Sequence, residues 1–294
     1  MKKLIFTTTI SILALSGASA QDVKFGIRGG LNLPNMMAGS VNTPASEGYN
    51  SRLATGWGLF TELQINPAFS LRLGIEYSGL GGKKDGMQAM PTQRLVTDMV
   101  SSNISMMGMT PEQEMAIGAL MLWSNSNPYY YANVENTTKF DYVMIPLLAQ
   151  CGINVGQSPW RIYANAGPFV SFIVSSKQVA QGNSKLFADA SGTSTLWDIF
   201  PDMAKVFVAN EFPDIAKTLS ESVTFGETNI TGEMKSTNFG VIGNLGIRYQ
   251  HNRHSFFLEA GGNYGFINVQ NDDTNGSNRL GAVSVMLGYA VALF

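Results

Sequence analysis

Apolar and polar residues alternate strictly in eight stretches of this chain. Alternation with a period of two places successive side chains on opposite faces, which predicts β-strands with one apolar and one polar face. In the first stretch Phe25 and Ile27 share the apolar face, opposite Lys24 and Arg28, and none of the eight apolar faces carries a charge. The predicted strands cover residues 23–33, 57–65, 70–78, 143–151, 161–172, 239–249, 256–266 and 283–293.

The polar faces favour a membrane barrel over the alternative, a secreted soluble β-sandwich. They consist mainly of Gly, Ser, Asn, Arg and Glu, which would make a poor hydrophobic core. The stretches are also longer than the about 5–6 residues of an ordinary strand. Aromatic residues gather near their ends, as in the girdles of outer-membrane barrels. These residues are Trp57, Phe69, Trp160, Tyr249 and Phe256.

The connections between the stretches alternate between short and long. The short ones are residues 66–68, 156–160 and 250–254, and the long ones are 34–53, 81–138, 175–236 and 269–279. Short periplasmic turns and long extracellular loops are typical of outer-membrane barrels. We therefore predict an all-β fold: an eight-stranded antiparallel up-and-down transmembrane β-barrel, whose interior is just wide enough for side chains to fill.

The first twenty residues have the three parts of a secretory signal peptide. Lys2 and Lys3 are followed by an apolar stretch over residues 4–15 and by small residues at 18–20. A membrane-spanning helix is the alternative, but it needs about 20 apolar residues. We expect a signal peptide at residues 1–20 and one barrel domain over residues 21–294.

Composition excludes several classes of protein. Only 14% of the residues are charged and the net charge is −2, without a long Lys/Arg run, so nucleic acid is not an expected partner. The 45% hydrophobic content argues against intrinsic disorder. One cysteine, Cys151, excludes an internal disulfide and a multi-cysteine metal site, and it falls on the apolar face as a small filler. We expect no cofactor and no metal.

Three segments resemble the PorT-like outer-membrane barrel proteins of the Bacteroidetes. They are residues 25–33 just after the signal peptide, residues 143–148 and residues 166–169. The terminal Phe294 resembles the aromatic residue that barrel-assembly machinery recognises, although it is not in register with Leu293 and the apolar face of its strand. The resemblance implies an outer-membrane location, with lipid and the assembly machinery as partners. One branch of this family is associated with protein secretion, and no defined activity is implied.

The charged residues of the polar faces carry both signs. Facing strands with mixed charges predict a structural network of ion pairs that fills the lumen; an anion-selective channel or a basic ligand pocket is the alternative. The set consists of Lys24, Arg28, Glu62, Arg72, Glu76, Arg161, Arg248 and Glu259.

No constellation of residues predicts catalysis. The two histidines, His251 and His254, fall in a short turn beside Ser255, without an acidic or cysteine ligand nearby. Residues 271–276 are acidic but lack the ligand pattern of a calcium site, so we expect a hairpin tip there. An outer-membrane hydrolase is the least favoured function.

The long loops contain helix signals and eight of the 15 methionines, which lie within residues 81–138. Thr110, Pro111 and Gln113 form a helix start, followed by an expected apolar stripe from Met115 to Trp123 that includes Leu122. Residues 197–207 are spaced for another helix, and Pro213 begins the next. We expect these helical insertions, over residues 81–138 and 175–236, to pack together as a cap over the barrel mouth.

The alternative for the loops is a surface that receives a hydrophobic ligand or a partner protein. Its candidate residues are Met106, Met107, Met109, Met115, Met121, Trp123, Trp197 and Phe200. We predict a non-catalytic outer-membrane protein with a structural, anchoring or surface-interaction role. The alternatives are a binder or conduit for small hydrophobic ligands under a methionine-rich cap and an accessory subunit of a secretion system.

Overall fold

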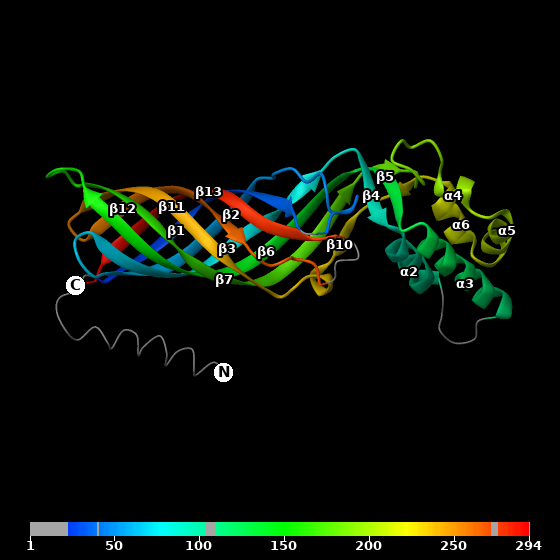
Figure 1. Cartoon of the computed structure of the whole chain (residues 1–294), viewed down its shortest axis with the longest axis horizontal. Helices are drawn as coiled ribbons and strands as arrows, with labels where there is room; N and C mark the ends of the chain where they lie inside the picture. Colours follow the sequence, from blue (N-terminus) through cyan, green and yellow to red (C-terminus); the bar gives the residue numbers. More distant parts are fainter. Residues whose placement is uncertain (1–22, 40, 104–109, 272–275, 294) are drawn as a thin grey trace.

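Eight long strands close a barrel in the computed structural model, which describes residues 23–39, 41–103, 110–271 and 276–293 (Figure 1). Each strand pairs antiparallel with its neighbour in the order β7-β11-β12-β13-β1-β2-β3-β6, and a β6–β7 pairing closes the ring. The predicted up-and-down barrel is confirmed. The strands are β1 (Val23–Ala38), β2 (Ala54–Gln64), β3 (Phe69–Lys84), β6 (Glu135–Asn154), β7 (Trp160–Gln181), β11 (Thr237–His251), β12 (His254–Gly265) and β13 (Asn278–Ala292).

The two faces of the barrel wall are those that the alternation predicts. Ile27, Ile75 and Leu287 are more than half exposed on the outside, whereas Arg28 and Glu76 are buried inside. An apolar outer surface suits lipid, and a closed sheet satisfies the backbone N–H and C=O groups that lipid cannot.

Aromatic pairs mark both ends of the apolar band. At the end with the short turns Trp160 packs against Tyr249, and at the other end Trp57 stacks on Tyr77, with ring centroids 5.1 and 5.7 Å apart. Two such belts are the usual interfacial anchors of outer-membrane barrels. The short connections are residues 65–68, 155–159 and 252–253, and Asn252 has the positive φ of 53° that a tight hairpin needs.

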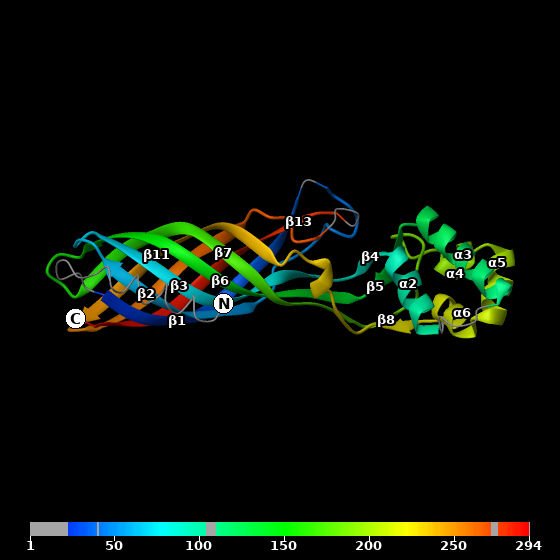
Figure 2. The ribbon, with the colours of Figure 1, turned by 90° about the horizontal axis from the view of Figure 1, so that it is seen from below.

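Several strands continue beyond the expected loop boundaries, which is a correction to the predicted ranges. β3 reaches Lys84, β6 begins at Glu135, and β7 runs to Gln181. In these extensions the buried positions include Asn136 and Thr138, so polar residues occupy both faces and the hydrophobic contrast that reveals a strand is missing. The extensions lie beyond the apolar band and form a stalk (Figure 2).

The two long insertions pack against each other as a helical module at the outer end of the stalk (Figures 1 and 2). The first insertion contains β4 (Met87–Pro91), α2 (Thr92–Asn103), α3 (Pro111–Ser126) and β5 (Tyr129–Asn133). The second contains β8 (Asn183–Ser184), α4 (Leu196–Ile199), α5 (Asp202–Glu211), α6 (Pro213–Ser220), β9 (Val223–Thr224), β10 (Glu227–Asn229) and the 3₁₀ helix η1 (Thr231–Glu233). The helices stand beyond the stalk and do not rest on the barrel rim as a cap.

The helix starts at Pro111 and Pro213 are confirmed, and Thr110 and Gln113 form the expected capping box. The predicted apolar stripe of α3 is right only in part, because Met115 and Leu122 are exposed. Two other members of the stripe, Leu120 and Trp123, are buried in the module core.

The helix expected over residues 197–207 is interrupted at Pro201, which separates α4 from α5 because proline supplies no backbone N–H. No helix in the described ranges is long and apolar enough to span a membrane. The predicted signal peptide, Phe294, Met106, Met107, Met109 and most of the 271–276 tip lie outside the described residues.

Candidate functional site

Six charged side chains inside the barrel form one chain of alternating sign, here called the lumen ladder. Its order is Glu76, Arg28, Glu259, Arg72, Glu62 and Arg248, contributed by β3, β1, β12, β3, β2 and β11. The sequence placed these residues on the polar faces, but it did not reveal their pairing. Three guanidinium groups and three carboxylates leave the ladder without net formal charge.

Close contacts join the members of the ladder. Arg28 binds Glu76 through both Nε and Nη2, at 2.8 and 2.6 Å, and its Nη1 lies 2.8 Å from Glu259. Arg72 Nη1 lies 2.6 Å from Glu259 Oε1 and Arg72 Nη2 3.3 Å from Glu62 Oε2. Arg248 donates to both oxygens of Glu62, at 2.8 and 2.6 Å. The two-point contacts fix geometry as well as charge.

Neutral side chains complete the hydrogen bonding of the buried carboxylates. Tyr163 Oη and Asn165 Nδ2 donate to Glu259 Oε1 at 2.8 and 3.1 Å. Gln150 accepts from Arg72 at 2.9 Å and donates to Glu62 at 3.3 Å. Prediction from charge alone missed these neutral residues, although Gln150 and Asn165 are on the polar faces of their strands.

Aromatic rings pack against the central arginines. The Arg72 guanidinium lies 4.5 Å from the ring centre of Phe60, and that of Arg248 lies 5.0 Å from Tyr163. The Nε atoms of both arginines have no hydrogen-bond partner among the described residues. Stacking on ring faces is a favourable environment for a guanidinium group in a water-poor interior.

Phe60, Tyr163 and a third ring beside Arg72, that of Phe257, each lie over a glycine in the adjacent strand. Phe257 is directly opposite Gly288, where a Cβ atom would overlap the ring. The same pairing occurs between Phe60 and Gly26 and between Tyr163 and Gly246. The glycines therefore make room for the aromatic layer that supports the ladder.

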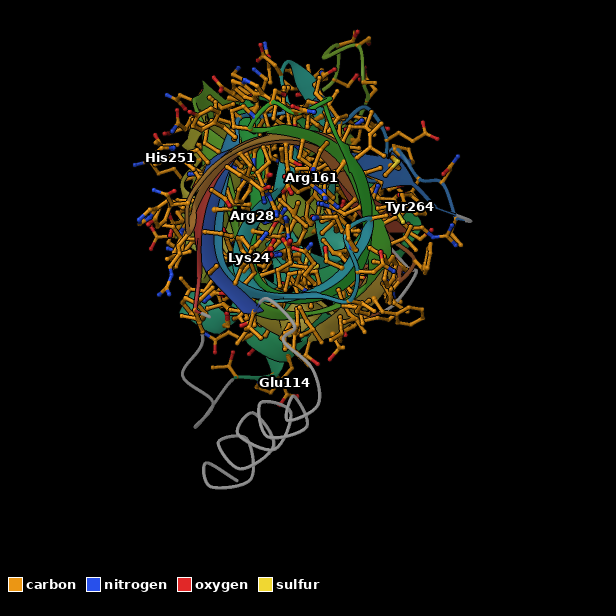
Figure 3. All side chains as sticks on the ribbon, turned by 90° about the vertical axis from the view of Figure 1, so that its left-hand side faces the viewer. Lys24, Arg28, Glu114, Arg161, His251 and Tyr264 are labelled. Atoms are coloured by element: carbon orange, nitrogen blue, oxygen red, sulfur yellow. The ribbon has the colours of Figure 1, made fainter. Side chains whose placement is uncertain are left out.

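Lys24 and Arg161, the other two predicted lumen charges, lie nearer the short turns. Figure 3 looks into the barrel from this end and shows both inside the ring with Arg28. Lys24 Nζ donates to Gln64 at 3.3 Å, and Arg161 donates to the carbonyl of Pro67 at 2.6 Å. The structure thus brings six of the eight predicted charges into the ladder.

Packed side chains fill the barrel on both sides of the ladder's centre. Arg72, Arg248 and Glu259 are each 1% exposed. Farther outward, Met144 and Leu148 belong to a fully apolar layer with two further residues, Phe169 and Ile242. The charges of the ladder therefore face one another within a packed lumen.

The candidate cap residues separate into two groups. Trp123, Phe200 and Trp197 meet in the core of the helical module, where the Trp123 and Phe200 ring centroids are 5.0 Å apart. Met121 packs half-buried against that core, whereas Met115 is exposed. Most of the described candidates are therefore used for internal packing.

The remaining candidate chemistry lies at the short-turn end and on the lipid face. His251 ends β11 and His254 begins β12, and His254 Nδ1 is 2.6 Å from the Tyr289 hydroxyl. Cys151 is exposed on the outer face of β6. His254 and Tyr289 are thus paired as in an interfacial girdle, and Cys151 is a small side chain on the lipid-facing surface.

A chamber of about 580 Å³ lies in the stalk between the barrel rim and the helical module. The sequence does not predict it, because its walls come from strand extensions and short strands without the alternation that reveals a strand. Met36, Met90 and Phe140 supply apolar walls, and Gln88 and Asn136 supply amides.

The ionised groups of the chamber have partners within it. Lys84 Nζ donates to Ala45 O at 2.6 Å and lies 4.2 Å above the Tyr49 ring, and Arg94 is 2.9 Å from Glu233. Burial raises the pKa of Tyr49 and of Tyr130 above the usual tyrosine value, so both phenols stay neutral. The chamber therefore combines apolar walls, amides and balanced charge.

Comparison with known proteins identifies a family. The model of the outer membrane protein beta-barrel domain matches residues 19–271. Among curated proteins there is no match.

Solved structures with similarity to this chain are distant. Neisserial surface protein A is 14% identical with a TM-score of 0.34, covering 91% of this chain and 96% of that one. OprG from Pseudomonas aeruginosa is 10% identical with a TM-score of 0.33, covering 94% and 98%. Ail of Yersinia pestis, solved with the heparin analogue sucrose octasulfate, is 8% identical with a TM-score of 0.33, covering 92% and 99%.

Proposed function

The chain belongs to the outer membrane protein beta-barrel domain family, and on that basis we propose that it is a closed, non-catalytic anchor that presents its helical module to a partner protein at the cell surface. The observation that carries this proposal is the lumen ladder. A barrel interior filled by paired charges and aromatic rings offers no path for a solute, so a role for the molecule has to be sought outside the membrane.

The shape of the outer part supports presentation of a surface. β3, β6 and β7 continue past the apolar band and hold the module away from the lipid (Figure 2). Leu122 of α3 and Val206 of α5 are 72% and 62% exposed on this module. Exposed apolar side chains on a structure held clear of the bilayer are suited to a protein contact.

The two finer alternatives have less support. A conduit for hydrophobic ligands under a methionine-rich cap would need its aromatic and methionine side chains free, but Trp123 and Phe200 are committed to the module core. A role as accessory subunit of a secretion system, implied by the resemblance to PorT-like proteins, would use the same module. A stable complex in mild detergent would favour that role, and a monomer at all concentrations would count against it.

Site-specific photocrosslinking in cells tests presentation of the module. A photoreactive amino acid in place of Leu122 is expected to form a protein adduct, because this side chain is exposed beyond the membrane. The matched control is Ile75, which is 62% exposed on the barrel wall and should react with lipid only. Equal protein adducts at both positions, or none at Leu122 and Val206, would contradict the proposal.

A further inference from the structure

One edge of β4 in the stalk has no partner strand in the described part of the chain. β4 pairs only with β5, in a sheet of two strands. On β5, Tyr131 exchanges backbone hydrogen bonds of 2.8 and 2.7 Å with Phe187, on the side away from β4. Ala89 is opposite Tyr131, so the antiparallel geometry directs its N–H and C=O away from β5.

This edge borders the chamber. Ala89 is only 9% exposed and contributes to the chamber wall, together with Gln88 and Met90. Backbone polar groups removed from water are normally hydrogen-bonded, and a buried strand edge is a template for another strand. β4 carries no charged residue, one of the usual protections of a strand edge, although it ends at Pro91.

Two amide side chains in the chamber have unused acceptors. Gln88 Oε1 and Asn136 Oδ1 are buried without a hydrogen-bond partner among the described residues. The side-chain nitrogen of Gln88 donates to the carbonyl of Val134. Because unpaired buried acceptors are costly, an occupant that supplies N–H or O–H donors would stabilise this site.

The charge of the chamber indicates a neutral occupant. Arg94 lies near Glu233 and Asp98, at 2.9 and 3.9 Å, and Lys84 is held by the Ala45 carbonyl. The charged side chains of the lining, Lys84, Arg94, Asp98 and Glu233, cancel formally, so the lining offers no excess charge to an ionised occupant. Met36, Phe140 and Ile230 offer apolar contacts for uncharged side chains.

We propose that the chamber binds an extended, uncharged peptide segment of a partner protein, added as a strand to the free edge of β4. Backbone groups of the segment would pair with Ala89 and Met87, and alternate apolar side chains would point into the chamber, as in other cases of strand addition. β4 has five residues, which at about 3.4 Å per residue gives about 17 Å of edge. This inference rests on the proposed function, since it names how the surface partner is recognised.

A proline at position 89 tests the edge directly. Ala89→Pro removes the outward N–H, while the hydrogen bonds between β4 and β5, which use the neighbouring residues, remain available. Ala89→Val is the matched control, because it adds similar bulk and keeps the N–H. The probe is a fluorescein-labelled heptapeptide of alternating threonine and valine, and binding to the full-length protein in detergent micelles is followed by fluorescence anisotropy.

We expect saturable binding to the wild type and to A89V, and at least about tenfold weaker binding to A89P. Hydrogen exchange of residues 87–91 should slow when the peptide is added to the wild type. Heat-modifiable migration in SDS and tryptophan fluorescence establish that both variants are folded.

Equal affinities of A89P and A89V, the lack of saturable binding to the wild type, or exchange protection confined to the helices would overturn the inference. Binding of maltoheptaose in place of the peptide would overturn it in favour of a carbohydrate site. The photocrosslinking result at Leu122 does not depend on Ala89, so failure of strand addition can be told apart from failure of surface presentation.

Discussion

Each charge in the lumen ladder is paired with at least one opposite charge, and neutral donors also reach two of its carboxylates, Glu62 and Glu259. Glu259 accepts hydrogen bonds from Arg28, Arg72, Tyr163 and Asn165. Glu62 accepts from Ser70, Arg72, Gln150 and Arg248. A buried ion pair gains little over an apolar core, but removal of one partner leaves the other charge uncompensated. We therefore propose that the ladder is a structural element and that Glu259, which joins Arg28 to Arg72, is one of its sensitive positions.

Substitution of this carboxylate tests the structural role. Glu259→Gln keeps the shape but leaves Arg28 and Arg72 short of a counter-charge, so we expect a loss of about 3–5 kcal/mol in the free energy of unfolding. Urea unfolding in lipid vesicles measures the loss. Glu227→Gln is the control, because its partner Lys177 is exposed and exposed ion pairs contribute little to stability. Equal effects of the two substitutions would refute the structural role.

At the scale of the strand, glycine and aromatic residues are paired across neighbouring strands. Gly26, Gly246 and Gly288 receive Phe60, Tyr163 and Phe257 against their backbones. Those rings in turn lie beside the guanidinium groups of Arg72 and Arg248. The wall and the ladder are consequently one packed unit, and a single added methyl group on the wall can disturb both.

Two glycine substitutions separate this packing from the general effect of adding a methyl group to a strand. Gly288→Ala should displace the Phe257 ring and cost about 1–3 kcal/mol, the usual penalty of overpacking. Gly29→Ala has no heavy atom closer than 3.5 Å to the new Cβ and should leave stability nearly unchanged. The temperature at which the folded band disappears in SDS compares them, and equal temperatures would contradict the pairing.

The elements differ in how far the sequence predicted them. The barrel strands were predictable because lipid demands apolar side chains outside and the lumen accepts polar ones, which gives maximal contrast between the faces. The stalk was not, because water on the outside and Asn136 or Thr138 on the inside remove that contrast. The start of α3 was predictable from local capping at Thr110, whereas its buried face depends on α5 and on other parts of the insertions that are distant in sequence.

In the lumen ladder and the chamber, too, local features could be predicted from the sequence and long-range features could not. Period-two alternation identified which charges face inward, since that is a local property of each strand. The order of the ladder, with Arg72 between Glu62 and Glu259, depends on strand tilt and on register between strands far apart in sequence. The chamber was not predictable, because it depends on a ribbon, β4 and β5, within an insertion that lacks strong alternation.

The whole molecule is elongated, with a filled barrel at one end and a helical module at the other (Figure 1). Its apolar wall and aromatic girdles fit an outer membrane, and the stalk carries the module clear of the lipid. The ion-paired interior and the free strand edge are separated along this axis, and we propose that stability depends mainly on the barrel and recognition on the stalk and module. This division supports the proposal that the protein is a closed anchor.

Electrical recording in planar lipid bilayers tests most directly whether the barrel is closed. The purified, refolded protein is added to one side under an applied voltage, with a known porin as the positive control for insertion. We predict no stepwise conductance from the wild type, because Arg72, Arg248 and Glu259 fill the lumen and are buried against each other and against aromatic rings. Reproducible conductance steps from the folded wild-type protein would contradict the closed anchor and would make the barrel itself a conduit.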